Sequence, residues 1–220
     1  MTPRRAYSLG PSQLLETSDG GATWRRLSRP PFGFGSPTFV DARRGVAVAG
    51  KGDFFRTGDG GRHWLPLRLP AAVLPGVAAF GRRLVAPAER YLPESGGTFR
   101  LVVYVSGDGG STWTARPAPR GWTPVIGTAD EQRFSAATRN VWFAAARRTL
   151  AVSRDAGRSW RVVRPVGIPP HRSIAAVDFT SGTLGWAIFS GPSQSVLMRT
   201  TDGGLHWKSA GPRKPKRNRH

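Results

Sequence analysis

Short apolar runs recur along the chain, and each of them leads into a turn that is rich in glycine. The runs are four or five residues long and mix β-branched, aromatic and aliphatic side chains, which is typical of strands. A second short run follows each turn, as at Arg25–Leu27 and Arg161–Val163. Two such runs around a glycine-rich turn predict a β-hairpin. The runs before the turns are Gln13–Glu16, Asp53–Arg56, Leu101–Val105, Thr149–Val152 and Val196–Arg199.

The turns share the motif Ser/Thr-x-Asp-x-Gly-x-x-Trp, which occurs five times; we call each copy a box. Successive box tryptophans are 40, 49, 47 and 47 residues apart. That period predicts either propeller blades or a helical solenoid, and the strand-like runs favour blades. We expect the Asp to accept backbone hydrogen bonds within the turn and the Trp to cover it. This predicts a structural role for the following residues: Asp19, Trp24, Asp59, Trp64, Asp108, Trp113, Asp155, Trp160, Asp202 and Trp207.

A weaker repeat precedes the boxes. Phe39, Phe80, Phe134 and Phe179 each lie 20 to 28 residues before a box Asp. The segments 39–48 and 179–188 align without gaps, and we expect 134–143 to follow the same plan with Asn140 at the glycine position. A complete unit therefore predicts four strands, the last two of which are joined by the box.

These boxes resemble those of the Asp-box, or bacterial neuraminidase repeat, β-propellers. That family includes sialidases, sortilin-type receptor domains, xyloglucan-degrading enzymes and photosystem II assembly factor-like proteins. The resemblance covers about residues 10–210 and implies an all-β propeller of four-stranded antiparallel blades. In the family the box lies between the third and fourth strands of a blade and away from the catalytic face, so the resemblance implies no catalytic role for the box.

About four and a half blades are encoded, because only 18 residues precede Asp19 and the first unit has room for its last two strands but not for all four. We expect a propeller over 1–210, with units at 7–29 (partial), 36–69, 75–116, 122–164 and 172–210, and a basic disordered tail at 211–220. Three explanations stay open for the incomplete unit: a missing N-terminal part, a five-bladed ring with one thin blade, or pairing with a second subunit as a homo-oligomer.

Composition narrows the classes further. The chain has 33 Lys and Arg against 13 Asp and Glu, a net charge of +20, and no Cys. Disulfides and thiolate metal sites are therefore excluded, and 28 Gly with 19 Pro disfavour a helical protein. No apolar run is long enough for a transmembrane segment. The charge favours either a solvated basic surface or a polyanion partner, which the tail would contact through phosphate.

Candidate chemistry is sparse. A sialidase needs a Tyr nucleophile assisted by Glu, an Asp acid/base and three arginines, and only Tyr7, Tyr91 and Tyr104 are available, with Glu94 close to Tyr91 in sequence. The adjacent pair Asp130 and Glu131 is typical of a solvated loop. His63 and His206 occupy the same box position, which indicates a structural role. The sequence predicts no metal, no cofactor and no assigned catalytic residue.

We therefore predict a non-catalytic binding or assembly module that recognises a protein or glycan partner. An exo-α-sialidase and a polyanion-binding protein are the alternatives. Trp142 and Trp186 are expected to pack between blades, and Trp122 to lie in a loop, with a part in a recognition surface as the alternative to a structural role. The resemblance favours export, yet the segment Met1–Pro11 lacks the apolar stretch of a signal peptide, so the compartment stays open.

Overall fold

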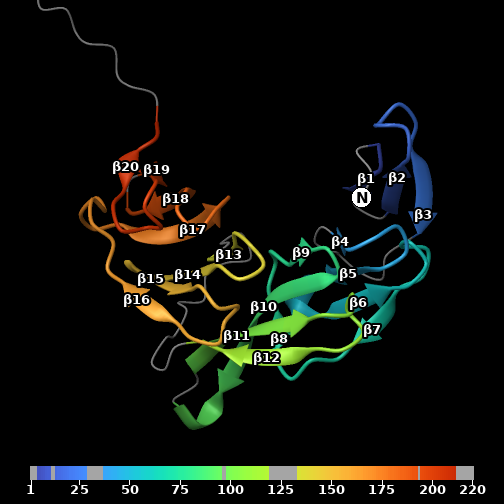
Figure 1. Cartoon of the computed structure of the whole chain (residues 1–220), viewed down its shortest axis with the longest axis horizontal. Helices are drawn as coiled ribbons and strands as arrows, with labels where there is room; N and C mark the ends of the chain where they lie inside the picture. The colour runs from blue at the N-terminus through green and yellow to red at the C-terminus, as the bar shows by residue number, and fades with distance from the viewer. Residues whose placement is uncertain are drawn as a thin grey trace, which may run out of the picture. The chain divides into compact units, whose positions relative to one another are not determined.

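The computed structural model describes residues 4–10, 13–28, 37–95, 98–118, 133–192 and 194–211. These residues form β-strands joined by turns, with two short 3₁₀ segments, η1 (Gly50–Gly52) and η2 (Pro93–Ser95), and no α-helix. The all-β prediction is confirmed. The chain divides into two compact units, Met1–Ala129 and Asp130–His220 (Figure 1). In the described part, no helix has the length and apolar character needed to span a membrane.

The first unit contains three antiparallel sheets. The first sheet has three strands in the order β1-β2-β3, and the second has four in the order β4-β5-β6-β7. In the third sheet the order is β12-β11-β10-β8, and β9 also pairs with β10, so that two short strands share the place of one. The strands are β1 (Ala6–Gly10), β2 (Gln13–Thr17), β3 (Arg25–Ser28), β4 (Thr38–Phe39), β5 (Gly45–Val48), β6 (Phe54–Thr57), β7 (Leu65–Leu67), β8 (Ala72–Val73), β9 (Ala78–Phe80), β10 (Arg83–Leu92), β11 (Thr98–Ser106) and β12 (Thr114–Pro117).

The second unit contains two antiparallel sheets of four strands, the fourth in the order β13-β14-β15-β16 and the fifth in the order β17-β18-β19-β20. The strands are β13 (Phe134–Ala136), β14 (Trp142–Ala146), β15 (Thr149–Ser153), β16 (Arg161–Val163), β17 (Ser173–Phe179), β18 (Gly185–Ser190), β19 (Val196–Thr200) and β20 (Lys208–Ser209).

Within each sheet, strands that are neighbours in the chain pair in space, except that β8 and β9 both pair with β10. Each predicted run before a box is a strand, and each box joins that strand to the outermost one. The first sheet has three strands among the described residues, fewer than the four of a complete unit but one more than the two predicted, because β1 also pairs with β2. The order of the strands agrees with the expected blades.

Each unit has a core made by two sheets packed face to face. In the first unit Val46 and Phe54 of the second sheet pack with Leu84 and Val102 of the third. In the second unit Phe143 of the fourth sheet stacks on Phe179 of the fifth, with ring centroids 3.5 Å apart and planes 4° from parallel. Burial between successive sheets is therefore the main source of stability within each unit.

A large side chain and a small one are paired where the first strand meets the second. Phe39 is opposite Gly45 in β4–β5, and Phe179 is opposite Gly185 in β17–β18. A Cβ added at Gly185 would lie 2.4 Å from Phe179 Cδ1, so the ring needs the glycine.

In the fourth sheet the large and the small residue have changed strands. The predicted alignment of Phe134 with the other phenylalanines, and of Asn140 with the glycines, was therefore wrong. Ala136 pairs with Trp142 in the register, so the small residue now lies on the first strand and the large one on the second. Trp142 is fully buried. In the third sheet Phe80 lies one residue away from the position that Phe39 occupies in the second sheet, because there Ala79 pairs with Leu84. The pair of the fourth sheet thus still combines one large and one small side chain, but the large one lies on the second strand instead of the first.

Replacing Gly185 by Ala should lower the free energy of unfolding by about 1–3 kcal/mol, the usual cost of overpacking a tight site. The control is Gly58→Ala, because an added Cβ at Gly58 meets no atom within 4 Å. Urea unfolding monitored by circular dichroism measures both. Equal midpoints for the two variants would show that the Phe179 ring does not require the glycine.

Candidate functional site

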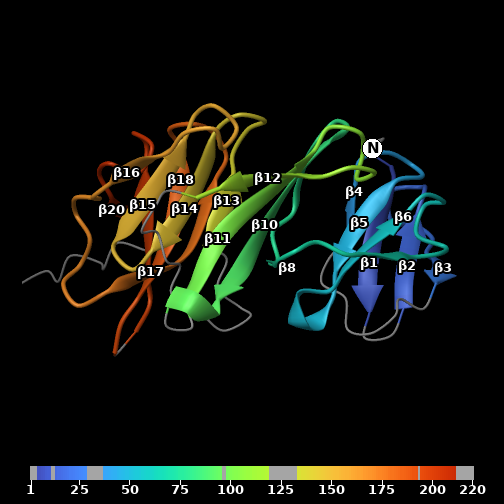
Figure 2. The same cartoon turned by 90° about the horizontal axis from the view of Figure 1, so that it is seen from below.

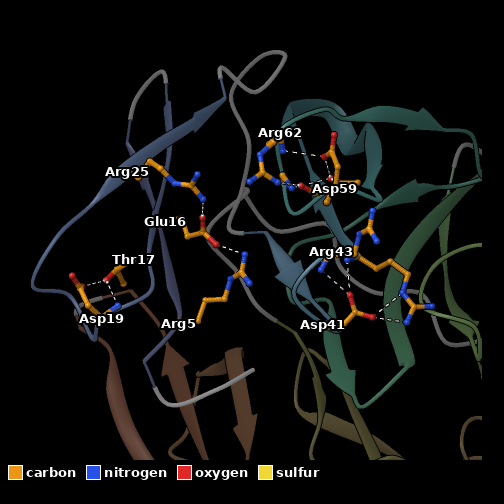
Figure 3. Close-up of polar contacts among 12 residues, drawn as sticks. Arg5, Glu16, Thr17, Asp19, Arg25, Asp41, Arg43, Asp59 and Arg62 are labelled. Atoms are coloured by element: carbon orange, nitrogen blue, oxygen red, sulfur yellow. Dashed lines mark hydrogen bonds and ion pairs between the residues drawn. The ribbon is translucent and has the colours of Figure 1, made fainter.

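The five boxes have one hydrogen-bonding pattern. The Ser or Thr hydroxyl donates to Oδ1 of the Asp at 2.7–2.9 Å and accepts the backbone N–H of the second glycine position at 2.7–3.0 Å. The same Oδ1 accepts the backbone N–H of the residue before the Trp at 2.9–3.0 Å. Figure 3 shows the first of these turns at Thr17 and Asp19. The carboxylate thus closes the turn on itself.

The residue before the Trp supplies a further hydrogen bond from its side chain. Three boxes use a hydroxyl, which donates to Oδ2 of the Asp at 2.5–2.7 Å. In the other two, Nδ1 of His63 lies 2.6 Å from Asp59 Oδ2 and Nδ1 of His206 lies 2.7 Å from Asp202 Oδ2. The two histidines therefore take the place of a hydroxyl. Within the described residues, no group of three or more His, Asp or Glu side chains is arranged to hold a metal ion.

The box tryptophans contribute both a donor and an apolar surface. The indole N–H donates to the carbonyl of the glycine three residues earlier at 3.0–3.2 Å in the boxes of Trp24, Trp64, Trp113 and Trp207. Burial of the ring differs widely, since Trp207 is 4% exposed and Trp24 is 44% exposed. The local turn is therefore the same in these boxes while its surroundings are not.

The hydrogen bonds keep the box carboxylates ionised. The hydroxyl and backbone N–H of Ser159 lower the pKa of Asp155 to about 2. The backbone N–H of His206, together with its ring, lowers the pKa of Asp202 to about 2. Donors from Thr23 and Thr112 hold the pKa of Asp19 and Asp108 well below the ordinary range. Each turn thus depends on a negative charge.

His206→Ser should leave the free energy of unfolding within about 0.5 kcal/mol of the parent, because a serine hydroxyl makes this bond in the fourth box. His206→Ala should cost about 0.5–1 kcal/mol, a value reduced by solvent exposure of the bond. Urea unfolding at neutral pH compares them. If Ser and Ala destabilise the chain equally, the side-chain bond to Asp202 contributes nothing.

Acid should destabilise the chain over a defined range. A carboxyl with a folded pKa near 2 and an unfolded pKa of about 3.9 contributes stability that is fully present above the unfolded value and is lost as the pH falls through the folded value. We expect the urea midpoint to fall between about pH 4 and pH 2. Asp155→Asn should be less stable at neutral pH and have a shallower acid loss, whereas an unchanged midpoint down to pH 2 would contradict this role.

Of the tyrosines considered for a sialidase, Tyr7 lies opposite Glu16 in the β1–β2 ladder, and Tyr91 is on the same strand face as Glu89. Tyr104 is 3% exposed within the core of the first unit. Tyr7 stacks on Phe39 with centroids 3.9 Å apart. Tyr91 lies on β10 and Glu94 in η2, and in the described structure no hydrogen bond joins them. Trp122, Asp130, Glu131 and the tail from residue 212 lie outside the described residues.

A buried ion cluster near Tyr7 was not predicted from the sequence. Glu16, with a side chain only 4% exposed, forms ion pairs with Arg5 and with Arg25, the latter at 2.6 Å (Figure 3). The two guanidinium groups compensate the negative charge of Glu16, which burial removes from water. Figure 3 also shows Asp41, which accepts the backbone N–H groups of Arg43 and Arg44 and so closes the β4–β5 turn.

The hairpin of β10 and β11 is the feature that best fits a binding site. β8 pairs with β10 only as far as Glu89, and β12 reaches only Val102 of β11. Residues 90–92 therefore pair with β11 alone, and the hairpin continues as a two-stranded ladder (Figure 2). Of this hairpin the sequence predicted only the run Leu101–Val105, and neither its length nor its register.

The two faces of this ladder differ in chemistry because side chains alternate along a strand. On one face Tyr91 is opposite Phe99, with centroids 5.1 Å apart, and Tyr91 is 55% exposed. On the other face Arg90 is opposite Arg100. Both arginines are exposed, and neither forms an ion pair with a carboxylate of the described residues.

The paired arginines border a small groove. Its volume is about 130 Å³, and its apolar wall is formed by Leu92, Val102 and Ala115. Like charges placed opposite each other in a ladder repel, and a bound anion would remove that repulsion. Burial raises the pKa of the neighbouring Glu89, whose side chain lies on the aromatic face. The arginine face can thus accept a carboxylate beside a small apolar group.

Two larger grooves lie elsewhere. One of about 520 Å³ is lined by Phe55, Leu67 and Arg68 in the first unit. The other, of about 800 Å³, is lined by Trp186, Arg199 and Lys208 on the fifth sheet, where the Arg199 guanidinium lies 5.9 Å from the Trp186 ring. Of the two tryptophans expected between sheets, Trp142 is buried and Trp186 is only half-buried.

No protein-family model matches the chain, and no curated protein matches it. Solved structures do. YCF48 from Cyanidioschyzon merolae aligns with 94% of this chain and 69% of its own, at 18% identity and a TM-score of 0.60. A structure of YCF48 bound to D1 peptide aligns with 94% and 77%, at 19% identity and a TM-score of 0.53. The GH74 xyloglucanase from Xanthomonas campestris aligns at 18% identity and a TM-score of 0.60 over 94% of this chain and 36% of that one.

The fold is a β-propeller. The identities are too low for the likeness to show more than fold, and the chain spans about a third of the length of the xyloglucanase. The sheets of this propeller are blades, and each box lies between the last two strands of its blade.

Proposed function

We propose that the chain is an Asp-box propeller that acts as a protein-binding module and takes an acidic segment of its partner on the β10–β11 hairpin. The observation that carries the proposal is the pair Arg90 and Arg100, opposed in the ladder without a carboxylate partner among the described residues. Two guanidinium groups on adjacent strands suit a carboxylate, since arginine donates in a planar fork.

The apolar wall of the groove supports a peptide rather than a free anion. A volume of about 130 Å³ between Leu92, Val102 and Ala115 accommodates one aliphatic side chain. A segment with an acidic residue near an aliphatic residue would place one group on the arginines and the other in the groove. Among the neighbours in fold, the YCF48 structure with a D1 peptide is an example of a propeller that binds a peptide.

The test uses a fluorescein-labelled peptide in which two glutamates flank a leucine, with fluorescence polarisation as the measurement at 0.15 M salt. Arg90→Ala/Arg100→Ala should weaken binding by at least about tenfold, because each hydrogen bond to a charged group contributes about 1.5–3 kcal/mol. The glutamine version of the peptide should bind as weakly to the parent chain.

The matched control is Arg161→Ala/Arg164→Ala, which removes the same charge from two exposed positions in and just after β16. It should leave the affinity within about twofold, since neither of these arginines lines the groove beside Arg90 and Arg100. Equal loss in both double variants would mean that the net charge attracts the peptide and would overturn the proposal. Heparin as a second probe separates the polyanion alternative: heparin binding that exceeds peptide binding and is weakened equally by both double variants favours that alternative.

A further inference from the structure

Four of the blades present equivalent side chains on the face turned toward the following blade, which we call the forward face. The register aligns Leu14, Phe54, Leu150 and Leu197, each three residues before the box Ser or Thr. Leu14 and Leu150 are fully buried and Phe54 is 3% exposed. Phe54 and Leu150 belong to the cores that join the second blade to the third and the fourth to the fifth.

The leucine on this face contacts the box of the following blade at a glycine. A Cβ added at Gly61 would lie 2.9 Å from Leu14 Cδ2, and one added at Gly204 would lie 2.5 Å from Leu150 Cδ1. The leucine therefore fills the space that the glycine leaves free. At the third blade the same place at Gly110 is occupied by Val46 of the second, at 3.1 Å.

An arginine of the preceding blade accompanies this contact. A Cβ added at the first glycine of the box, Gly60, Gly109 or Gly203, would lie 3.4–3.8 Å from a guanidinium nitrogen. The arginines are Arg5, Arg44 and Arg154. The forward face thus brings one aliphatic side chain and one cation to the box of the next blade, beside its ionised Asp.

The forward face of the fifth blade carries the equivalent leucine, which is exposed, together with two cations at other positions of the blade. Leu197 is 44% exposed and its cross-strand neighbour Ile188 is 42% exposed. Arg199 and Lys208 lie opposite each other beside Trp186, and both line the groove of about 800 Å³. Buried counterparts in the other blades indicate that this is a packing surface.

In the box of the first blade, the space beside the glycines that a leucine would fill is open. An added Cβ at Gly21 would meet only Trp24 of its own turn, at 4.0 Å, and one at Gly20 would meet nothing within 4 Å. Trp24 is 44% exposed, whereas Trp207 of the box that receives Leu150 is 4% exposed. The first box thus has a glycine that no leucine of the described residues reaches.

We propose that the forward face of the fifth blade docks on the first box of a second copy of this chain, with Leu197 against Gly21 and the cations Arg199 and Lys208 toward Asp19. The contact repeats the one that Leu14 makes with Gly61 and Leu150 with Gly204. It joins two different surfaces, so the association is head-to-tail.

Sedimentation velocity of the full chain over a hundredfold range of concentration tests the association. We expect particles of two chains or more that dissociate on dilution. Leu197→Glu should shift the chain to the monomer at all concentrations, because it places a carboxylate against the apolar seat and near Asp19. Leu65→Glu is the matched control, since Leu65 is 58% exposed but lies on the outermost strand of the second blade. A monomeric parent chain, or equal dissociation by both variants, would overturn the proposal.

Cross-linking identifies the surfaces without relying on a disruptive variant. The chain has no Cys, so a single cysteine can be introduced at either surface. Leu197→Cys and Ala22→Cys chains, mixed and treated with a short bismaleimide, should give a heterodimer in high yield, whereas Leu65→Cys with Ala22→Cys should not. Equal yields for the two mixtures would contradict the assigned surfaces. The hairpin of the proposed function lies on the third blade, so peptide binding by Arg90 and Arg100 stands or fails separately.

Discussion

The structure depends on the Asp carboxylate of each box, because both of its oxygens accept hydrogen bonds from the same turn. An ionised Asp at this point orders a turn with few buried side chains, because one oxygen accepts the hydroxyl and the backbone N–H and the other accepts a further side chain. The same turn donates a backbone N–H to the first turn of its own blade, as Gly60 does to the Arg43 carbonyl at 2.7 Å. The box therefore holds the outer hairpin in register with the inner strands, and the faces of the blade are presented for packing.

Packing between blades then depends on placing each large side chain against a small one. Where Phe39 needs Gly45, the fourth blade places Trp142 against Ala136, and the space is filled in both cases. The box glycines serve the same principle, since the missing side chain admits a leucine from the preceding blade. Conserving the summed volume lets individual positions differ between blades.

Charge is distributed with less regularity than volume. The buried Glu16 is compensated by two arginines, and the box carboxylates are compensated by hydrogen bonds. Arg90 with Arg100 and Arg199 with Lys208 are opposed without such compensation among the described residues. Excess positive charge of this kind is costly where it is concentrated, and it marks the surfaces at which an acidic partner would contribute most.

The sequence alone determined the kind of structure. Its local signals, an Asp and a Ser or Thr two residues apart, glycines at fixed offsets and a Trp, act within eight residues, so the turn and its flanking strands follow without knowledge of the rest of the chain. The structural role of His63 and His206 could be read in the same way, since both occupy one position of a repeated turn. Contacts between distant residues are a different matter, because their side chains meet only after the strands have paired. Tertiary structure alone decided that Trp142 takes the place of a phenylalanine from the other strand, that Arg90 lies opposite Arg100 and that two arginines surround Glu16. It alone also decided that Leu197 is exposed while Leu14 and Leu150 are buried, and that Trp24 is exposed while Trp207 is buried.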